Sequence, residues 1–471
     1  GDRLFIVESL SDRVAILDAA SGRTLSRTPV GREAKYIAVT PDGERLVAGN
    51  GLSRSVSILD ARTGKLLETR GIGRASVGRQ VACTPDGRWA LGAHLVSHDE
   101  QITTQINRGW MHSNGFTLMD LSRKGHRLTL LLDTLLDGAA NPWGLALSAD
   151  GRRLYVSLSG VHEVAFVDLE RTLAFASEVK AEQVVPLERD VELMVEKKAF
   201  ARRVPSGGKG PRGLALSEPL GELLVANYFD DTVSVLDASS GGLKALIPLY
   251  DKPPLLTLRR KGEFLFNDGG VTFERWFSCA SCHQEDATVD GLNWDLLNDG
   301  IGNPKNNKSM HDAVDTPPAM WSGVRENMEE AGAAGQRFAG FFPDPEKNRA
   351  LLEYISTPER VRSPYRDGDP TAVRRGSRLF LRARCDACHP SPAYTDRKMH
   401  DLALVSPNDA VSRFDTPSLR ECWRTAPYLH DGRAATLEEV FSVHDPRGLH
   451  GRTKGLTRAQ IRDLLEYVRS L

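Results

Sequence analysis

The sequence has little of several features that would place it in a specialised class. Six cysteines in 471 residues are too few for a disulfide scaffold. No uninterrupted apolar run approaches the roughly 18 residues that a membrane-spanning helix needs. The 61 Lys and Arg residues balance the 62 Asp and Glu residues, so no global basic field exists to attract nucleic acid or an anionic membrane. We therefore expect no disulfide-rich fold, no membrane span and no nucleic-acid partner.

The remaining composition is that of an ordinary globular protein. Hydrophobic residues make up 40% and charged residues 26% of the chain, which excludes the disordered and fibrous classes. The length predicts two or three domains. The chain opens directly in strand-like sequence at residues 4–7, with no signal-like apolar segment before it. We expect any export signal to have been removed or never to have been present.

A short apolar phrase that ends in Asp recurs through residues 1–250. Turn phrases such as Thr40–Gly43, each followed by an apolar strand, separate the copies. The spacing is close to a propeller blade of about 40 to 50 residues, with two longer insertions. The pattern resembles YVTN-type β-propellers and predicts an all-β propeller of five to seven blades without helices, ahead of a β-sandwich or open meander. The copies are residues 14–18, 56–60, 116–120, 164–168 and 233–237.

The two insertions carry distinctive residues. Residues 93–115 contain His94, His98 and His112, a set that could bind a metal. Residues 170–210 are rich in Glu, Lys and Arg. Because loop histidines are more often not ligands, we expect the insertions to form a docking surface against the second half of the chain.

Four of the six cysteines fall in two Cys-x-x-Cys-His motifs, at residues 279–283 and 385–389. By chance such a string should arise on the order of 10⁻³ times in this chain. The motif is typical of covalent haem c attachment, in which two thiols bind the haem and the histidine is the proximal iron ligand. A four-cysteine zinc site is the alternative, but each cysteine pair is followed at once by His. The predicted attachment residues are Cys279, Cys282, Cys385 and Cys388, with His283 and His389 as iron ligands.

This identification also predicts a compartment. Covalent haem attachment of this type is made outside the cytoplasm in bacteria, so we expect a periplasmic or otherwise exported protein. The two remaining cysteines, Cys83 and Cys422, are expected to be buried free thiols.

Each motif follows a similar amphipathic stretch, at residues 260–266 and 374–380, which we expect to be a helix that delivers the cysteines. A further helix is expected near residues 346–355, and an extended link at residues 363–370. The sequence therefore predicts two mainly α cytochrome domains, at residues 251–367 and 368–471.

The segments after the second motif resemble a known family. Residues 415–420 (DTPSLR), 425–433 (TAPYLHDGR) and 435–440 (ATLEEV) are similar to the signature of bacterial di-haem cytochrome c peroxidases and the MauG group, over roughly residues 258–471. The resemblance implies an oxidoreductase that uses hydrogen peroxide. It further implies a small cytochrome c or cupredoxin as electron donor, or a protein substrate, and allows a Ca²⁺ ion between the haem units.

The resemblance also points to a distal ligand for the second haem. In this family that ligand follows the Leu-Glu-Glu stretch at a fixed distance, where His444 stands here. His450 is the second candidate, and His400 with Met399 the third. Two histidine ligands would close the iron to small molecules and lower its potential relative to a His/Met site. This tilts the prediction away from a standard peroxidase.

The first haem departs from the peroxidase pattern, because the next histidine after His283 is His311. The resemblance therefore implies an open iron where peroxide or dioxygen binds. Cleavage of peroxide needs a proton carrier and a polar donor. The candidates are Glu326, Glu329, Glu330 and Gln336, although each also suits a solvated helix face.

Two tryptophans, Trp294 and Trp321, are candidates for electron transfer between the haems or for core packing. Three alternatives to a peroxidase stay open. The protein could oxidise residues of a partner docked by the propeller, as MauG does. It could be an electron-transfer protein with His311 or Met310 on the first iron, or a binding protein with structural or sensory haems.

Overall fold

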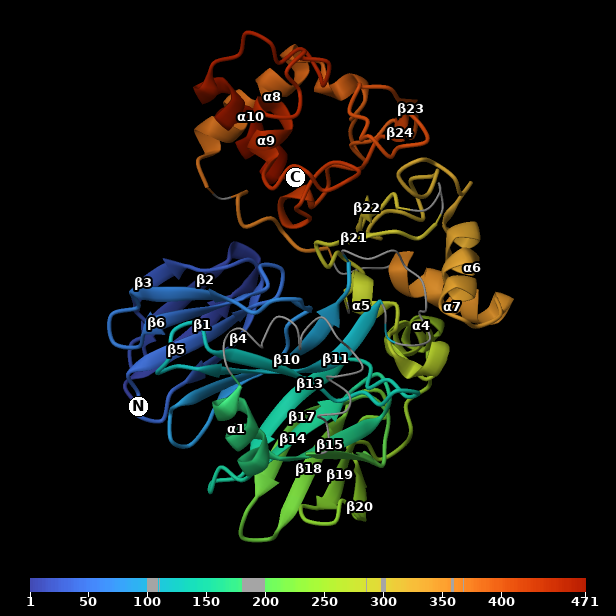
Figure 1. The fold of residues 1–471 in the computed structure, drawn as a ribbon. Helices are drawn as coiled ribbons and strands as arrows, with labels where there is room; N and C mark the ends of the chain where they lie inside the picture. Colours follow the sequence, from blue (N-terminus) through green and yellow to red (C-terminus); the bar gives the residue numbers. More distant parts are fainter. Residues whose placement is uncertain are drawn as a thin grey trace. The chain divides into compact units, whose positions relative to one another are not determined.

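The computed structural model divides into two compact units (Figure 1). The β unit contains Gly1–His98, Gln105–Leu255 and Asn267–Ser281, and the helical unit contains Asp99–Thr104, Leu256–Phe266 and Cys282–Leu471. The described residues are 1–99, 109, 111–179, 200–284, 286–297, 302–356, 360–366 and 368–471.

The β unit contains five antiparallel sheets, each built from consecutive strands (Figure 1). The first is β1 (Arg3–Glu8), β2 (Arg13–Asp18) and β3 (Thr24–Pro29), and the second is β4 (Ala34–Val39), β5 (Arg45–Asn50), β6 (Ser55–Asp60) and β7 (Leu66–Gly71). The third is β8 (Ala75–Ser76), β9 (Val81–Cys83), β10 (Trp89–Ser97), β11 (His112–Asp120) and β12 (Arg127–Leu131). The fourth is β13 (Pro142–Leu147), β14 (Arg153–Leu158), β15 (Glu163–Asp168) and β16 (Ala201–Pro205), and the fifth is β17 (Pro211–Ser217), β18 (Glu222–Asn227), β19 (Thr232–Asp237) and β20 (Leu243–Pro248).

The repeated phrases of the sequence correspond to repeated local structure. The five Asp-ended copies are the strands β2, β6, β11, β15 and β19. The turn phrase closes in the same way in separate sheets: Thr40 Oγ1 donates to Asp42 at 2.6 Å, and Ser148 Oγ donates to Asp150 at 2.6 Å. Each turn joins two antiparallel strands, so the sequence repeats because one strand-turn-strand unit is built several times.

Apolar clusters lie between successive sheets rather than in one common centre. The described strands do not close into a barrel, and the sheets are joined by side-chain packing. One cluster joins the first two sheets through Val14, Ile16, Leu46 and Leu59. The next clusters follow in chain order around Val47, Ile58, Val81 and Ala90, then around Leu91, Leu118, Leu154 and Val156, and then around Tyr155, Val164, Leu223 and Leu236.

The expectation that this half lacks helices was wrong. Helix α1 (Leu169–Glu178) follows directly after β15. Asp168, the last residue of the repeated strand phrase, is also the N-cap and accepts a hydrogen bond from Arg171 N at 3.0 Å. The described parts of the insertions form no additional sheet: one lengthens β10 and β11, and the other forms α1. Residues 100–108, 110 and 180–199 lie outside the described part of the chain.

The helical unit contains short helices joined by long connections (Figure 1). Helices α4, α7 and α8 confirm the three helices expected near the two motifs. The elements are α4 (Leu258–Asn267), α5 (Ala280–His283), β21 (Asn293–Trp294), β22 (Lys305–Asn306), α6 (Met328–Phe338), α7 (Pro345–Ser356), α8 (Pro370–Arg382), a 3-10 turn (Cys385–Ala387), β23 (Met399–His400), β24 (Phe414–Asp415), a 3-10 turn (Cys422–Arg424), α9 (Leu437–Ser442) and α10 (Arg458–Arg469).

Two halves of the helical unit repeat the same construction. Residues 316–331 and 425–440 align without a gap, and each contains a one-residue β-bridge followed by an N-capped helix. The N-caps are Asn327 and Thr436, and in both helices a Glu of the first turn reaches back to the backbone ahead of the cap. The two halves are therefore related units, as the doubled haem motif indicated.

Glycine explains the shared stretch before each motif. A Cβ at Gly262 of α4 would overlap the carbonyl oxygen of Ala350 in α7, and a Cβ at Gly376 of α8 would overlap that of Asp463 in α10. In each half, two helices therefore cross at a glycine where their backbones approach closely.

The two compact units differ from the three predicted domains. Residues 251–255 and Asn267–Ser281, which includes Cys279, belong with the β unit, and the remaining residues of both predicted haem domains fall in the helical unit. Among the described helices, none combines the length and the apolar character required to cross a membrane.

Candidate haem sites

The two proximal histidines are oriented in the same way. His283 Nδ1 donates to the carbonyl oxygen of Thr288 at 3.3 Å, and His389 Nδ1 donates to that of Tyr394 at 2.9 Å. Each acceptor lies five residues after its histidine. Because a carbonyl can only accept, Nδ1 carries the proton and Nε2 is left to bind a metal.

Burial keeps both imidazoles neutral. It lowers the pKa of His283 and of His389 to about 4, and the carbonyl hydrogen bonds oppose this only in part. A neutral imidazole is the form that ligates iron. The residues of both motifs therefore suit the proximal side of a haem.

The motif thiols also suit covalent haem attachment. All four are free cysteines. Burial raises the pKa of Cys279 and of Cys385 to about 11, and it also raises the pKa of Cys388. Within the described residues, no group of metal-ligating side chains joins the cysteines of the two motifs, so a four-cysteine metal site has no support.

A second histidine faces His389 across a metal-sized gap. The ring centroids of His389 and His450 lie 6.5 Å apart, with an angle of 40° between the planes. Two imidazoles on opposite sides of one metal should have centroids about 6.2 Å apart, since each metal–nitrogen bond is about 2.0 Å and the ring centre lies about 1.1 Å further. The pair therefore fits one iron held from both faces.

The loop that carries His450 is fixed by its own hydrogen bonds. The Asp445 carboxylate accepts from Leu449 N at 2.8 Å and from His450 N at 3.0 Å. Phe441 lies against the His450 ring at 5.4 Å between centroids. Two residues later, Arg452 N donates to Ala383 O at 2.8 Å, which ties the loop to the end of α8 beside the second motif. Burial lowers the pKa of His450, partly offset by Asp445.

The ring seen beside His389 is that of His450, the second candidate, and His444 as distal ligand stays a prediction. His444 follows the last turn of α9, where its backbone N donates to Glu439 O at 3.1 Å. The third candidate, His400, uses Nε2 to bind Asp396 at 2.8 Å. Cys388, Asp396 and His400 lie within 4.8 Å of one another, but Cys388 belongs to the haem motif. Met399 pairs with Asp415 in the small β23–β24 sheet.

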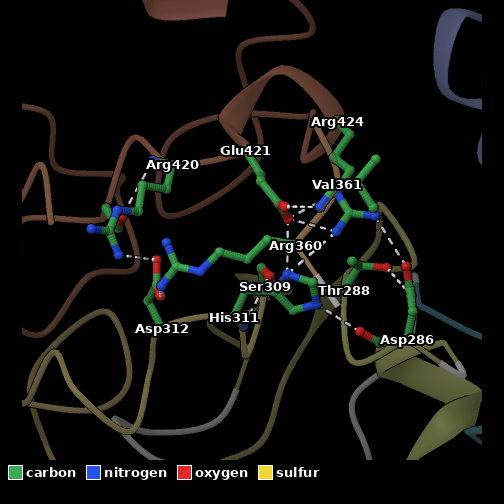
Figure 2. A network of polar contacts seen from close by, with 11 residues as sticks. Asp286, Thr288, Ser309, His311, Asp312, Arg360, Val361, Arg420, Glu421 and Arg424 are labelled. Carbon is green, nitrogen blue, oxygen red and sulfur yellow. Dashed lines mark hydrogen bonds and ion pairs between the residues drawn. The ribbon is translucent and has the colours of Figure 1, made fainter. Parts of the chain in front are cut away.

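His311 has no nitrogen available for the first iron. Its Nδ1 bonds the Glu421 carboxylate at 2.8 Å, and its Nε2 donates to the Asp286 carbonyl at 2.7 Å (Figure 2). The backbone N of the other proposed cap, Met310, donates to Ala287 O. Both ring nitrogens of His311 thus have partners within the protein, and ligation of the first iron by His311 stays a prediction.

Glu421 is the centre of a network that joins the two halves of the helical unit (Figure 2). It accepts from Val361 N at 2.8 Å and from Arg424 at 2.6 Å, besides His311. Arg424 also reaches Asp286 at 3.1 Å. Burial raises the pKa of Glu421, but the hydrogen bond from His311 and the charge of Arg424 outweigh it and lower the pKa to about 2. Glu421 is therefore a fixed anion at neutral pH.

The four proton-transfer candidates lie on α6 or directly before its N-cap. The backbone N of Glu330 donates to the N-cap Asn327 at 2.9 Å, and its carboxylate accepts from Glu326 N at 2.8 Å, so Glu330 stabilises the start of α6. Gln336 is buried and donates to Asn348 at 3.0 Å, which holds α6 against α7. Glu329 is exposed, and with Glu330 it lines a surface hollow completed by Asn327, Ala333, Pro343, Asp344, Pro345 and Asn348. Structural contacts therefore account for Glu330 and Gln336.

Both candidate relay tryptophans have their indole N–H hydrogen-bonded. Trp294 donates to the Asp290 carboxylate at 2.7 Å, and Trp321 donates to Asn306 O at 2.7 Å. Burial raises the pKa of Asp290 to about 6. The Trp321 carbonyl accepts from Asp415 N at 2.8 Å, so Trp321 lies where the first half meets the second.

The three histidines of the first insertion belong to the polar interior of the third sheet. His94 bonds Thr117 at 2.7 Å, His98 bonds Ser113 at 3.2 Å and His112 bonds Ser97 at 3.1 Å. Burial lowers their pKa values to about 4, 4 and 3. Within the described residues no metal-ligand group includes them, so the metal interpretation has no support.

Comparison with known proteins gives several relatives. No protein-family model matches the chain. The gamma subunit of hydrazine synthase from Kuenenia stuttgartiensis is 30% identical over 45% of this chain and 77% of that subunit. The beta subunit is 29% identical over 43% of this chain, which spans about half of that subunit at 53%. The methylamine utilization protein MauG of Methylophilus methylotrophus is 23% identical over 46% of this chain and 83% of MauG.

A further relative and a solved structure are also similar to part of the chain. The cytochrome c551 peroxidase of Nitrosomonas europaea is 24% identical over 47% of this chain and 83% of that protein. Among solved structures, hydrazine synthase of Kuenenia stuttgartiensis under xenon pressure is 28% identical over 47% of this chain and 89% of that chain, with a TM-score of 0.43.

Proposed function

Because the chain belongs to the family that includes the hydrazine synthase gamma subunit, MauG and the di-haem cytochrome c peroxidases, we propose that it is an exported di-haem c oxidoreductase that reduces hydrogen peroxide. One haem is attached at Cys279 and Cys282, the other at Cys385 and Cys388. The observation that carries this proposal is the asymmetry of the two sites. His450 pairs with His389 at 6.5 Å, whereas within the described residues no second imidazole pairs with His283 at such a separation.

The first site is the proposed reaction site. When bound there, the haem supplies an iron with one position open to peroxide and the ability to exchange electrons. His283 holds the group from the proximal side, oriented by the Thr288 carbonyl. Overall, one H₂O₂ takes up two electrons and two protons, its O–O bond breaks, and two waters are released. Glu326 and Glu329 remain the proposed proton carriers, because Glu330 and Gln336 are held by other contacts.

The second site is proposed to relay electrons. His389 and His450 would hold this haem, and two imidazoles would stabilise its ferric state relative to a His/Met pair. The electrons would come from a small cytochrome c or a cupredoxin. Trp321, at the junction of the two halves, is the proposed intermediate between the sites.

Two buried oxygens support a Ca²⁺ ion as part of this proposal. The side-chain carbonyl oxygens of Asn293 and Asn306 are buried and have no hydrogen-bond donor. The two residues face each other across the β21–β22 pair, and their amide groups donate to the backbone of the second half, at Asp431 and Pro427. Neutral oxygens of this kind are ligands that Ca²⁺ accepts.

We propose that the five sheets of the β unit are blades of a β-propeller, as their repeated strands and stacked apolar clusters suggest. Such a unit could dock a partner whose residues are oxidised, as the similarity to MauG suggests. A second candidate function is the handling of a small nitrogen compound, favoured by the similarity to two subunits of hydrazine synthase.

Stopped-flow spectroscopy of the mature protein tests the proposal. We expect two haems per chain, one high-spin and one low-spin in the ferric state, with a rapid spectral change on adding peroxide. Two low-spin haems that do not respond to peroxide would establish the electron-transfer alternative instead. A response to hydrazine or hydroxylamine but not to peroxide would favour the nitrogen compound.

A further inference from the structure

The segment that leads into the first haem motif is part of the β unit. Helix α4 ends at Asn267, and the chain then packs along the β unit before it reaches Cys279. Gly138 N donates to Glu274 O at 2.6 Å, and Gly269 N donates to Gly160 O at 2.8 Å. This differs from the second motif, which begins three residues after α8 ends.

Ionic contacts strengthen this attachment. The Arg275 guanidinium bonds the Asp137 carboxylate at 2.6 Å and the Glu163 carboxylate at 2.9 Å. Arg203 approaches the same two carboxylates, at 3.2 Å and 2.5 Å. Two arginines and two acids thus hold the segment at Arg275, four residues before Cys279.

Asn141 extends this attachment into the haem motif itself. Its side-chain amide donates to Ser278 Oγ at 2.9 Å and to Asn267 O at 3.3 Å. Its side-chain oxygen accepts from Ser281 Oγ at 3.1 Å, and Ser281 Oγ accepts in turn from Ser278 N at 3.0 Å. Ser281 stands between the two cysteines of the motif, directly before Cys282.

Asn141 is itself held by a buried chain of polar groups. Its backbone N donates to Asn114 Oδ1 at 3.1 Å, and Asn114 Nδ2 donates to Asp133 at 2.9 Å and to Trp276 O at 2.8 Å. Asp133, Asn114 and Ser281 are 0% exposed and Asn141 is 3% exposed. Buried polar groups that satisfy one another fix a single arrangement, because any displacement leaves a desolvated donor or acceptor unpaired.

The backbone at Asn141 is a property of the repeat, whereas its side chain is particular to this copy. Asn141 has φ 58°, and Glu33 and Gly210, which precede the first strands of two other sheets, have φ 54° and 63°. Asparagine tolerates this left-handed conformation better than most residues. The left-handed backbone is therefore shared by several repeats, whereas the Asn141 side chain, which bonds Ser278 and Ser281, is specific to this one.

We propose that Asn141 is a positioning residue for the first haem, acting through Ser281 and Ser278. The Asp133–Asn114–Asn141 chain fixes the turn between the two attachment cysteines, and through this turn it influences the orientation and the potential of the first haem. The second motif has Ala387 at the position of Ser281, and the alanine side chain can neither donate nor accept a hydrogen bond. This inference rests on the proposed function only in requiring a haem at Cys279 and Cys282.

Two substitutions test it in the mature di-haem protein. Asn141→Gly removes the amide but keeps the left-handed backbone, and Ser281→Ala removes one hydroxyl and leaves Asn141 in place. Asn227→Ala is the matched control, because Asn227 is equally buried and its amide bonds only Thr232 and Ser234, within the fifth sheet. The second haem of each variant is an internal control.

The readouts are redox titration followed by absorbance and electron paramagnetic resonance of the ferric state. Both test variants should shift the midpoint potential and the resonance of the first haem, with both properties of the second haem unchanged. Loss of the first haem, with the second haem retained, in Asn141→Gly would also support the inference. Asn227→Ala should alter neither haem.

The outcome that overturns the inference is a first haem with wild-type potential and resonance in Ser281→Ala and in Asn141→Gly. If Asn141→Gly does not fold, Ser281→Ala decides alone. An equal change in both haems, or a change in Asn227→Ala, would show general destabilisation and also reject the inference. A wild-type protein without haem at Cys279 and Cys282 would instead reject the proposed function.

Discussion

At each haem turn, one backbone carbonyl decides which nitrogen of the histidine faces a metal. Thr288 O and Tyr394 O accept the Nδ1 proton of His283 and His389, and this leaves Nε2 for iron. Neither acceptor depends on its side chain. The orientation therefore comes from the five-residue turn after each histidine.

The first prediction concerns His450. His450→Ala should convert the second haem from low-spin to high-spin and open it to cyanide or imidazole, because the distal ligand is lost. His444→Ala, the matched control, should leave the low-spin spectrum intact. Absorbance and electron paramagnetic resonance distinguish the two, and the reverse pattern would restore His444 as the ligand.

The second prediction concerns pH dependence at Glu421, whose pKa is lowered from 4.5 to about 2. A carboxylate with a lowered pKa stabilises the fold above the unfolded pKa, and the effect is lost as pH falls through the folded value. Glu421→Gln should therefore reduce the free energy of unfolding by about 2 kcal/mol at pH 7, after a discount for partial solvent screening. The difference from wild type should shrink between pH 4.5 and pH 2.

Urea unfolding of the holoprotein at pH 7, 5 and 3 measures this difference. Asp463→Asn is a suitable comparison, because Asp463 pairs with Arg375 at 2.6 Å on an exposed surface. It should change stability by less than about 1 kcal/mol. A difference for Glu421→Gln that is independent of pH would contradict the assignment.

Residue-level prediction from sequence was good where the chemistry is local and poor where it depends on a loop. The six motif residues are recognisable because attachment needs adjacent thiols and imidazole. His444 was preferred over His450 because counting along the chain assumes the loop length of the family. In this chain the Asp445 carboxylate accepts from Leu449 N and His450 N, and the ring of His450 lies 6.5 Å from that of His389.

At the scale of elements, each half of the helical unit depends on a helix crossing at glycine. Gly262 and Gly376 occupy these crossings, where α4 meets α7 and α8 meets α10. The amphipathic pattern predicted the helices, but not their partners. The close approach is visible in sequence only as a glycine shared by the two stretches.

The third prediction follows from this crossing. Gly376→Ala should destabilise the fold by about 2 kcal/mol, because the new methyl group meets the Asp463 carbonyl and forces α8 and α10 apart. Gly335→Ala in α6 is the control, since a Cβ there meets nothing within 4 Å. It should stabilise the fold by about 0.5 to 1 kcal/mol. Thermal unfolding followed by circular dichroism compares the two.

Helix α1 shows why an element can be missed. The repeated phrase reads as a strand that ends in Asp, and β15 obeys it. The same Asp168 carboxylate then caps helix α1, and the repeat pattern does not predict this helix. Likewise Glu330 reads as an exposed acid in sequence, whereas in the structure it closes the first turn of α6.

At the scale of the whole molecule, the two related halves of the chain's C-terminal part each contain one candidate haem site, and the two sites differ in their surroundings. Both have the same proximal arrangement, and among the described residues a neighbouring imidazole is seen at the second site alone. Repetition was evident from sequence, because motif and capped helix recur together. The difference between the sites was expected from the missing histidine after His283, and the identity of the opposing residue required the structure.

The fourth prediction separates the two sites. Cys385→Ala combined with Cys388→Ala should leave one haem that still responds to peroxide, but turnover with a reduced cytochrome c donor should fall at least 100-fold, because the relay is gone. Cys83→Ala combined with Cys422→Ala should retain both haems, since neither thiol belongs to a motif. Full turnover with a single haem would reject the relay.

The packing of residues 267–281 on the β unit bears on how this protein can be recombined. A chimera cut at residue 250, where the repeats end, would graft a foreign scaffold onto the haem-bearing part and leave Arg275 and Ser281 without their partners. A junction placed after Ser281, so that residues 1–281 including α4 all come from this protein, keeps Arg275 and Ser281 with their partners. Hybrids in which the repeats alone are exchanged should therefore contain less haem, or a first haem with an altered midpoint potential, even when every residue of the two haem motifs is retained.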